Sequence, residues 1–413
     1  MKKNVLAAAI LVSVSSAASA ASSVTLYGIV DVGYNAGSTM SYTGSYSDDN
    51  VTYIQTLPSP LMPKSMGIKI TDITSTTNPI YSYDNSFATK TTTKVNQQDG
   101  YHDDSRLGIK GQEDLGNGLS AVFKAEMRFK ADTGSLSTQL DQSYVGLKGT
   151  FGEVTVGRRL TITDDLFGYD SAAKELSGTG LGAVFNNNLS YRGAFSGLIV
   201  GADISTGENI NGYTTDANGY KTIGGRAYQY AAGAQYNFGP GAVAAGYEHT
   251  AVGKNAYALG LKYKVGSVEM FGRVTHTKQT VDHYLLSSTS LMDKSIKGIG
   301  FALGLNYIIT PNDVLAVSYS QLNKKSKEDT YYTWSSAVVS TMSVKEKSRM
   351  LSLDYTHSLS KRTSVYAGAS VSRTKTSAQG GFTYNNQFNE GLDLPSYTSS
   401  KSYSYNVGLR HSF

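Results

Sequence analysis

The feature that most constrains the fold is a series of short segments in which apolar residues recur at every second position. In the clearest of these, Leu119–Phe129, the residues Leu119 and Phe123 share one face, whereas Lys124 and Glu126 share the other. A period of two is that of a β-strand with two chemically different faces. A soluble sheet can show the same alternation, so one segment alone does not identify the environment of the sheet.

The number of these segments narrows the choice. Sixteen occur, and they begin near Ser23, Asp104, Leu119, Leu140, Glu153, Asn188, Leu198, Arg226, Gly241, Asn255, Ser267, Gly298, Asp313, Ser348, Thr363 and Tyr403. An even number of this size is typical of outer-membrane barrels that enclose an aqueous lumen.

The connections between the segments alternate in length. The short ones are rich in Gly, Pro, Asn and Asp, which suit tight hairpins, and lie at 115–118, 151–152, 196–197, 239–241, 265–266, 310–313 and 359–362. The long, polar ones lie at 36–103, 159–187, 205–225, 278–297, 323–347 and 374–402. Short turns at one end and long loops at the other are typical of outer-membrane barrels. The composition of 36–103 is compatible with a hairpin, with a cover over the barrel mouth, or with a disordered insert.

The N-terminal residues have the three parts of an export signal. A positive start at Met1–Lys3 precedes an apolar core at Val5–Val12, and Ala18-Ser19-Ala20 fits a cleavage site. We therefore expect a signal peptide at 1–20 and a single β-barrel domain at 21–413. No later stretch approaches the ~20 apolar residues of a membrane helix.

Composition argues against several other classes. The chain has no Cys, so disulfide and thiol chemistry are excluded. The net charge of +5 comes without a basic cluster, so we expect no nucleic-acid partner. The six His residues are scattered and fit neither a nucleophile elbow nor a metal-binding spacing, so we expect no enzyme, cofactor or metal.

Several motifs together resemble the trimeric general porins of Gram-negative bacteria, particularly the β-proteobacterial type. They are Ser23–Asp31, Ser105–Leu119, Tyr144–Gly149, Phe151–Arg158, Leu359–Thr363 and Val407–Phe413. The resemblance implies an all-β, 16-stranded antiparallel transmembrane barrel, a homotrimer, and passive diffusion of small hydrophilic solutes and ions. It also implies outer-membrane lipid and lipopolysaccharide as partners, and barrel-assembly machinery that reads a signal at the terminal Phe413.

In such porins the third long loop folds inward and narrows the lumen. In this chain that loop is 159–187, and its carboxylates are candidates for one side of the constriction: Asp164, Asp165, Asp170 and Glu175. Asp164 and Asp165 also suit the first turn of a short helix, and the two roles are compatible.

The opposite side of the constriction is predicted to be basic. The residues on the lumen side of the alternation are Arg106, Lys110, Lys124, Arg128, Arg159 and Arg192. Arg106 matches an arginine that lines the constriction in the family. Arg158 follows the outward side, although a bulge at the strand end would exchange it with Arg159.

Two family arginines are missing, because Asp141-Gln142 and Val184–Asn187 stand where arginine is usual. One charge ~10 Å from an ion in water contributes only ~0.4 kcal/mol, further reduced by salt. We therefore expect a weak anion preference.

Two alternatives stay open at this stage. A substrate-specific channel for a sugar or organic acid would use aromatic residues such as Trp334 and the pair Tyr331-Tyr332. An adhesive barrel whose loops bind a host or a phage is compatible with diffusion.

Overall fold

The computed structural model describes residues 22–45, 87–99, 102–167, 181, 184–215, 221–250, 253–287, 290–332, 338–382 and 396–413. The predicted signal peptide at 1–20 and the middle of the first loop lie outside these residues. No helix among the described residues has the length and apolar character needed to cross a membrane.

The described chain is almost entirely β-strand. The strands of its first half are β1 (Ser23–Ser45), β2 (Phe87–Asp99), β3 (Arg106–Gly116), β4 (Leu119–Arg128), β5 (Gln142–Gly149), β6 (Gly152–Leu160), β7 (Val184–Phe195), β8 (Leu198–Thr215) and β9 (Lys221–Phe238). Those of its second half are β10 (Gly241–His249), β11 (Lys254–Val265), β12 (Val268–Ser287), β13 (Ser290–Thr310), β14 (Asp313–Tyr332), β15 (Val338–Ser358), β16 (Thr363–Phe382) and β17 (Ser396–Ser412). One short helix, α2 (Ile162–Phe167), follows β6.

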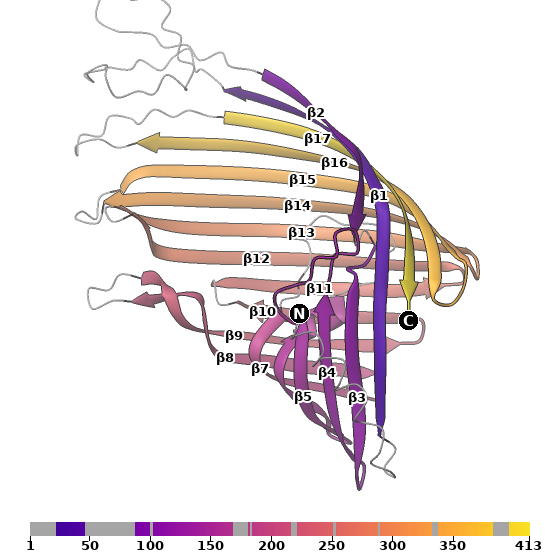
Figure 1. The fold of residues 1–413 in the computed structure, drawn as a ribbon. Helices are drawn as coiled ribbons and strands as arrows, with labels where there is room; N and C mark the ends of the chain where they lie inside the picture. Colours follow the sequence, from indigo (N-terminus) through magenta and orange to yellow (C-terminus); the bar gives the residue numbers. More distant parts are fainter. Residues whose placement is uncertain are drawn as a thin grey trace, which may run out of the picture.

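The sheet closes on itself through β1. The lower part of β1 pairs with β3, from Ser23 opposite Gln112 to Ile29 opposite Arg106. Along its other edge β1 pairs with β17, so that the first and last strands lie side by side and the C-terminus lies next to β1 (Figure 1). Strands β3 to β17 each pair with the next strand in the chain, which gives a closed ring of sixteen antiparallel strands. The predicted sixteen-stranded barrel is confirmed.

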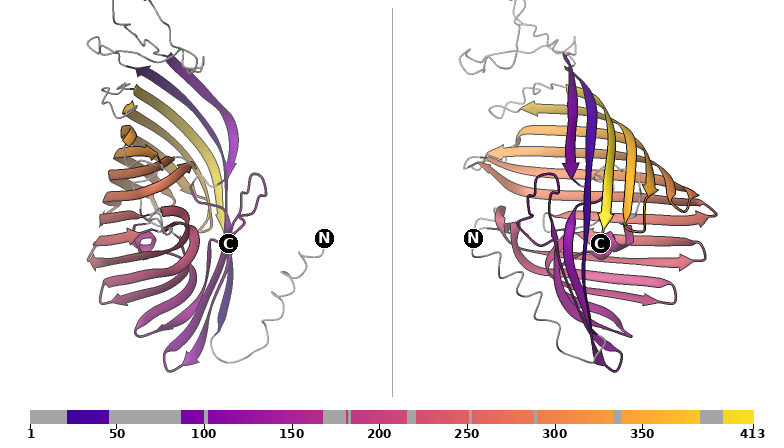
Figure 2. Two further views of the ribbon diagram at one scale, coloured as in Figure 1. Left: turned by 90° about the vertical axis from the view of Figure 1, so that its left-hand side faces the viewer. Right: turned by 45° about the vertical axis from the view of Figure 1, so that its right-hand side comes forward.

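The first long connection contributes a seventeenth strand. Above the β3 pairing, β1 continues to Ser45 and pairs with β2, from Val32 opposite Asp99 to Thr43 opposite Phe87. Figure 2 shows β2 lying beside the upper part of β1, which remains paired with β17 along its other edge. The pairing therefore extends into 36–103, which the alternation alone assigns to a loop.

The later strands also extend further into the long connections than the alternation predicts. Strand β15 begins at Val338 and β17 at Ser396, several residues before the apolar pattern becomes visible. Apolar alternation marks only the part of a strand that faces lipid, whereas backbone pairing continues into water. Sequence pattern therefore locates the apolar band and underestimates the strands.

The two faces of the barrel differ as the alternation predicts. On β15 the side chains of Leu351 and Leu353 are exposed on the outside, whereas Ser352 and Asp354 between them are buried on the inside. Lipid accepts the apolar face, and the polar face lines the lumen. Tight turns close the opposite end, and in the turn after β3 Asn117 (φ 53°) and Gly118 (φ 77°) adopt the left-handed region.

Candidate pore constriction

The segment after β6 turns into the barrel and docks on its inner wall. Buried Ile162, Leu166 and Phe167 of α2 form an apolar cluster with Phe185 and with small residues of the wall. The wall positions beneath the helix are Ala231, Ala244, Ala256, Ala258, Gly201, Gly233 and Gly246. A Cβ atom at Gly246 would lie 2.7 Å from the Phe167 ring. Small wall residues thus provide the space in which the loop lies, in agreement with the inward fold that the resemblance implies.

Polar anchors hold the same segment at both ends. The backbone N–H of Ile162 donates to Asp203 Oδ2 at 2.7 Å. The hydroxyls of Thr161 and Thr163 donate to Glu248 Oε2 at 3.0 and 2.6 Å. At the other end, buried Arg273 donates to the Phe167 carbonyl at 2.8 Å. The bonds to the Ile162 N–H and to the Phe167 carbonyl satisfy backbone groups that a short helix leaves unpaired.

Arg192 ties the loop to β7 and β8. Its guanidinium contacts Asp165 Oδ2 at 2.7 Å and Asp203 Oδ2 at 3.1 Å, and it donates to the Leu160 carbonyl at 3.1 Å. Two carboxylates therefore accompany this one cation, so Arg192 holds the loop in place and adds no positive excess to the lumen.

Arg106 lies on the inward side of β3, as predicted, and shares a partner with Arg410 of β17. Arg106 contacts Asp103 Oδ1 at 2.8 Å, and Arg410 contacts Asp103 Oδ2 at 3.0 Å. Both guanidinium groups remain partly exposed. Two partly exposed cations therefore share one ion-pair partner at this point of the wall, and the fully buried carboxylate of Asp31 lies opposite Arg410 on β1.

Arg128 is also on the inner face, with a different charge balance. It forms ion pairs with Asp104 and, at 2.9 Å, with Asp141 Oδ2. Asp141 occupies a position where the family usually has arginine. In this chain that position therefore carries a carboxylate, which forms an ion pair with Arg128.

Lys110 and Lys124 gather around Tyr27 of β1. Their ammonium groups lie 5.3 and 5.8 Å from the centre of the Tyr27 ring. The Tyr27 hydroxyl donates to Glu126 Oε2 at 2.7 Å, and Lys124 contacts the same oxygen at 3.3 Å. This cluster carries a positive excess of one, on the turn side of Arg106.

Arg159 points inward and Arg158 does not. Arg159 contacts Glu153 Oε1 at 2.6 Å and lies over the Tyr144 ring at 4.8 Å. Arg158 donates to the Leu140 carbonyl and to Asn186. The register shift between β6 and β7 places the extra residue on β7 and not on β6. The alternation along β6 is therefore undisturbed, and Arg159 faces inward as Thr155 does.

The two described loop carboxylates both lie in the first turn of α2, as the helix interpretation predicts. Burial, assisted by the negative charge of Asp165, raises the pKa of Asp164 to about 6. Glu248 and Asp141 act in the same direction, whereas Arg128 opposes them. The remaining candidates, Asp170 and Glu175, lie outside the described residues.

Several functional contacts escaped the sequence analysis. Arg410 carried an available signal, because it alternates with the outward residues Val407 and Leu409. Asp203, Glu248 and Arg273 follow the inward side in the same way, but their partners belong to a loop that approaches them only in the folded barrel. Among the described residues, no cluster of His, Cys, Asp or Glu is suited to hold a metal ion.

A closed barrel that faces lipid with apolar residues and keeps a narrowed, charged lumen is an outer-membrane channel. Comparison with known proteins shows which family of channels this is. A family model described as Gram-negative porin matches residues 7–377. The chain therefore belongs to the Gram-negative porin family, whose fold is that of channels.

Individual relatives agree with this assignment. Outer membrane porin protein 32 of Delftia acidovorans is 27% identical over 75% of this chain and 84% of its own length. An outer membrane porin protein of Bordetella pertussis is 26% identical over 100% of both chains. These matches place the protein in the Gram-negative outer membrane as a general diffusion porin.

Solved structures show the same fold. The anion-selective porin from Comamonas acidovorans covers 95% of this chain and 100% of its own, with a TM-score of 0.57 and 21% identity. In-vitro folded OmpT of Vibrio cholerae covers 96% of this chain and 99% of its own, with a TM-score of 0.52 and 13% identity.

Proposed function

We propose that this general diffusion porin weakly prefers anions, and that Arg106 and Arg410 carry the preference. The supporting observation is that both guanidinium groups share the single carboxylate of Asp103. An anion that passes this part of the wall meets two partly exposed guanidinium groups, whereas the neighbouring carboxylate of Asp31 is fully buried. The cluster of Lys110 and Lys124 around Tyr27 adds a positive excess along the passage.

The state of the loop supports the same sign. Asp165 is bound to Arg192, and the pKa of Asp164, raised to about 6, lets this carboxyl lose its charge on mild acidification. The described part of the loop therefore opposes the arginines less than its composition indicates.

The preference is weak because most other cations are compensated. Arg128 and Arg192 each contact two carboxylates, and Arg159 contacts one. A single excess charge ~10 Å from the ion contributes ~0.4 kcal/mol, which corresponds to about a twofold bias.

The test is the reversal potential of single channels under a KCl gradient at pH 7.5. We expect a chloride-to-potassium permeability ratio above one, lowered by up to about twofold in Arg106→Gln and in Arg410→Gln. Lys361→Gln, in a tight turn at the opposite end from the long loops, is the matched control and should leave the ratio unchanged. Cation selectivity of the wild type, or equal ratios in all variants, would contradict the proposal.

We further propose that the protein is a homotrimer that contacts outer-membrane lipid and lipopolysaccharide, and that the assembly machinery recognises its last strand. One similar structure, OmpT of Vibrio cholerae, is described in a trimer form. In this chain Phe413 closes the β1–β17 seam, because its N–H and C=O bond Gly28 at 3.0 Å each. Native mass spectrometry of detergent-purified protein tests the trimer, for which a monomer would be the contrary result.

A further inference from the structure

The outer face of β12–β17 changes from apolar to basic. On β15 the outward row runs from Leu353 and Leu351 directly to Arg349, Lys347 and Lys345. The outward rows of the other five strands also pass from apolar to basic residues, on β12 by way of His276 and on β14 by way of Gln321 and Asn323. We call the resulting set the cationic belt, and its members are Lys278, Lys297, Lys325, Lys345, Lys347, Arg349, Arg373, Lys375 and Lys401.

Strand register brings these cations together. Lys278 lies opposite Lys297, which lies opposite Lys325, and Lys325 lies opposite Lys345. In the adjacent rows Lys347 faces Lys375, and Arg373 lies between Arg349 and Lys401. Like charges directly opposite one another on paired strands are destabilising. An arrangement of this kind on six successive strands therefore favours an anionic partner.

The protein does not supply that partner. All nine belt side chains are exposed, and within the described part of the chain none forms an ion pair. Nearby lysines outside the belt differ, since Lys327 contacts Asp329 at 2.7 Å and Lys294 contacts Glu328. Carboxylates thus pair with lysines beside the belt, whereas the described residues provide no ion pair to the belt itself.

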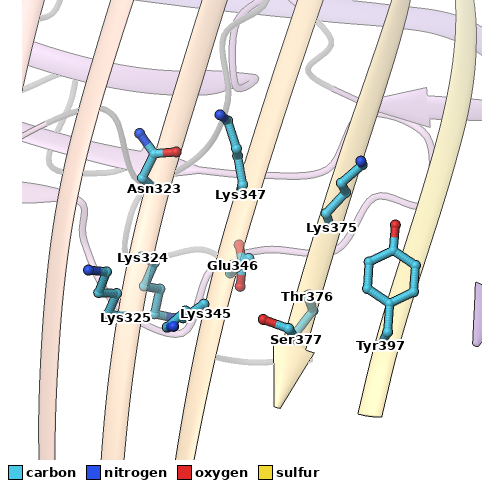
Figure 3. A pocket seen from close by; sticks show the side chains of 10 residues that line it. All are labelled: Asn323, Lys324, Lys325, Lys345, Glu346, Lys347, Lys375, Thr376, Ser377 and Tyr397. Carbon is cyan, nitrogen blue, oxygen red and sulfur yellow. The ribbon is translucent and has the colours of Figure 1, made fainter. Parts of the chain in front are cut away.

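The belt includes a cavity that fits a small anionic group. The lining of a cavity of about 330 Å³ contains five lysines and one carboxylate, that of Glu346. The lysines are Lys324, Lys325, Lys345, Lys347 and Lys375, and the neutral lining residues are Asn323, Thr376, Ser377 and Tyr397. Figure 3 shows these side chains arriving from the neighbouring strands β14, β15, β16 and β17. Ammonium groups with nearby hydroxyls are suited to charge-assisted hydrogen bonds with phosphate.

The position of the belt identifies the occupant. It lies immediately beyond the lipid-facing band, on the side of the long connections, which is the extracellular side in such barrels. A lipid whose chains cover Leu351 and Leu353 therefore places its headgroup at the belt. We propose that the belt binds the phosphates of a phosphorylated glycolipid in the outer leaflet, which assigns residues to the lipid contact proposed above.

The belt is restricted to one sector of the barrel. On β9 to β11 the outer face instead carries aromatic rings. Tyr230 stacks on His249 at 4.8 Å between centroids, and Tyr257 stacks at 6.2 Å on His276 of β12, beside the edge of the belt. Aromatic rings suit a membrane interface without demanding negative charge. Bound phosphoglycolipid should therefore concentrate along β12–β17.

The test uses the full-length protein in detergent, titrated with bisphosphorylated lipid A and followed by native mass spectrometry. The triple variant Lys345→Gln/Lys347→Gln/Lys375→Gln removes the lysines around the cavity. The control Lys264→Gln/Lys361→Gln/Arg362→Gln removes the same charge at the turn end. Each cation near an anionic lipid surface contributes roughly fivefold, so we expect at least a tenfold loss of affinity in the belt variant alone.

Three outcomes would overturn the proposal: equal losses in both triple variants, equal binding of dephosphorylated lipid A, or displacement of the lipid by millimolar inorganic phosphate. Conductance in neutral phosphatidylcholine bilayers separates this inference from the proposed pore function. If lipid binding is lost while the channel stays ohmic, the belt is confirmed independently of selectivity. Specific lipid binding by a protein that does not conduct would leave the belt intact and refute the pore.

Discussion

At the scale of single residues, the partners of a charge decide what the charge can do in the lumen. Arg106 and Arg192 are both inward-facing arginines, yet Arg192 lies between Asp165 and Asp203, whereas Arg106 shares Asp103 with Arg410. The first arrangement fixes a loop, and the second leaves positive charge facing the passage. Formal charge along the sequence does not distinguish them.

Asp164 should make ion selectivity depend on pH. Its pKa, raised to about 6, means that the carboxyl is charged at pH 7.5 and largely neutral at pH 5. Loss of one negative charge should raise the chloride-to-potassium permeability ratio by up to about twofold on acidification. Reversal potentials between these pH values measure the change. In Asp164→Asn the rise should disappear and the ratio should be high throughout; an undiminished rise would assign the titration to another group.

At the scale of elements, α2 stays inside the barrel because its apolar face finds a complementary wall. Leu166 approaches the position of a Cβ at Gly233 to 2.7 Å, and Phe167 does the same at Gly246. Larger residues there would exclude the helix. A turn and a half of helix has little stability of its own, so tertiary packing maintains it.

Truncation of Phe167 should therefore loosen the constriction. Phe→Ala in a packed core typically costs about 3–5 kcal/mol, and here the loss falls on the docking of α2. We expect Phe167→Ala to raise mean single-channel conductance and current noise without unfolding the barrel. Phe123→Ala, an equal truncation on the exposed outer face, is the control. Identical traces for the two variants would show that α2 does not narrow the pore.

At the scale of the whole molecule, stability depends on closing the ring. Each backbone group left unpaired in lipid costs several kcal/mol, so the first and last strands must meet. Phe413 completes that seam, and its ring lies where a Cβ at Gly28 would be, 2.4 Å from Phe413 Cζ. Side-chain-free Gly28 permits this approach.

Loss of the terminal residue should impair assembly. Deletion of Phe413 removes both its backbone bonds and its ring, whereas Phe413→Ala removes the ring alone. We expect the folded fraction in membranes to fall severalfold on deletion and less in Phe413→Ala, as measured by heat-dependent mobility in SDS gels. Wild-type levels for the deletion would rule out an assembly role of the last residue.

The sequence by itself determined the barrel, because the alternation needed to face lipid on one side and water on the other repeats in every strand. It also determined the inward side of Arg106, Lys124 and Arg128, since side-chain direction follows from strand parity. The full strand lengths escaped it, because pairing continues beyond the lipid, where no alternation is required.

Only the tertiary structure decided which charges remain uncompensated. Asp103 and Arg410 are far apart in the chain and meet because β17 returns to β1. Folding of the barrel likewise brings α2 against Gly201, Gly233 and Gly246. It also places the cations of six strands next to one another in the cationic belt. Parity is a local property of each strand, but electrostatic balance depends on distances that exist only once the ring has closed.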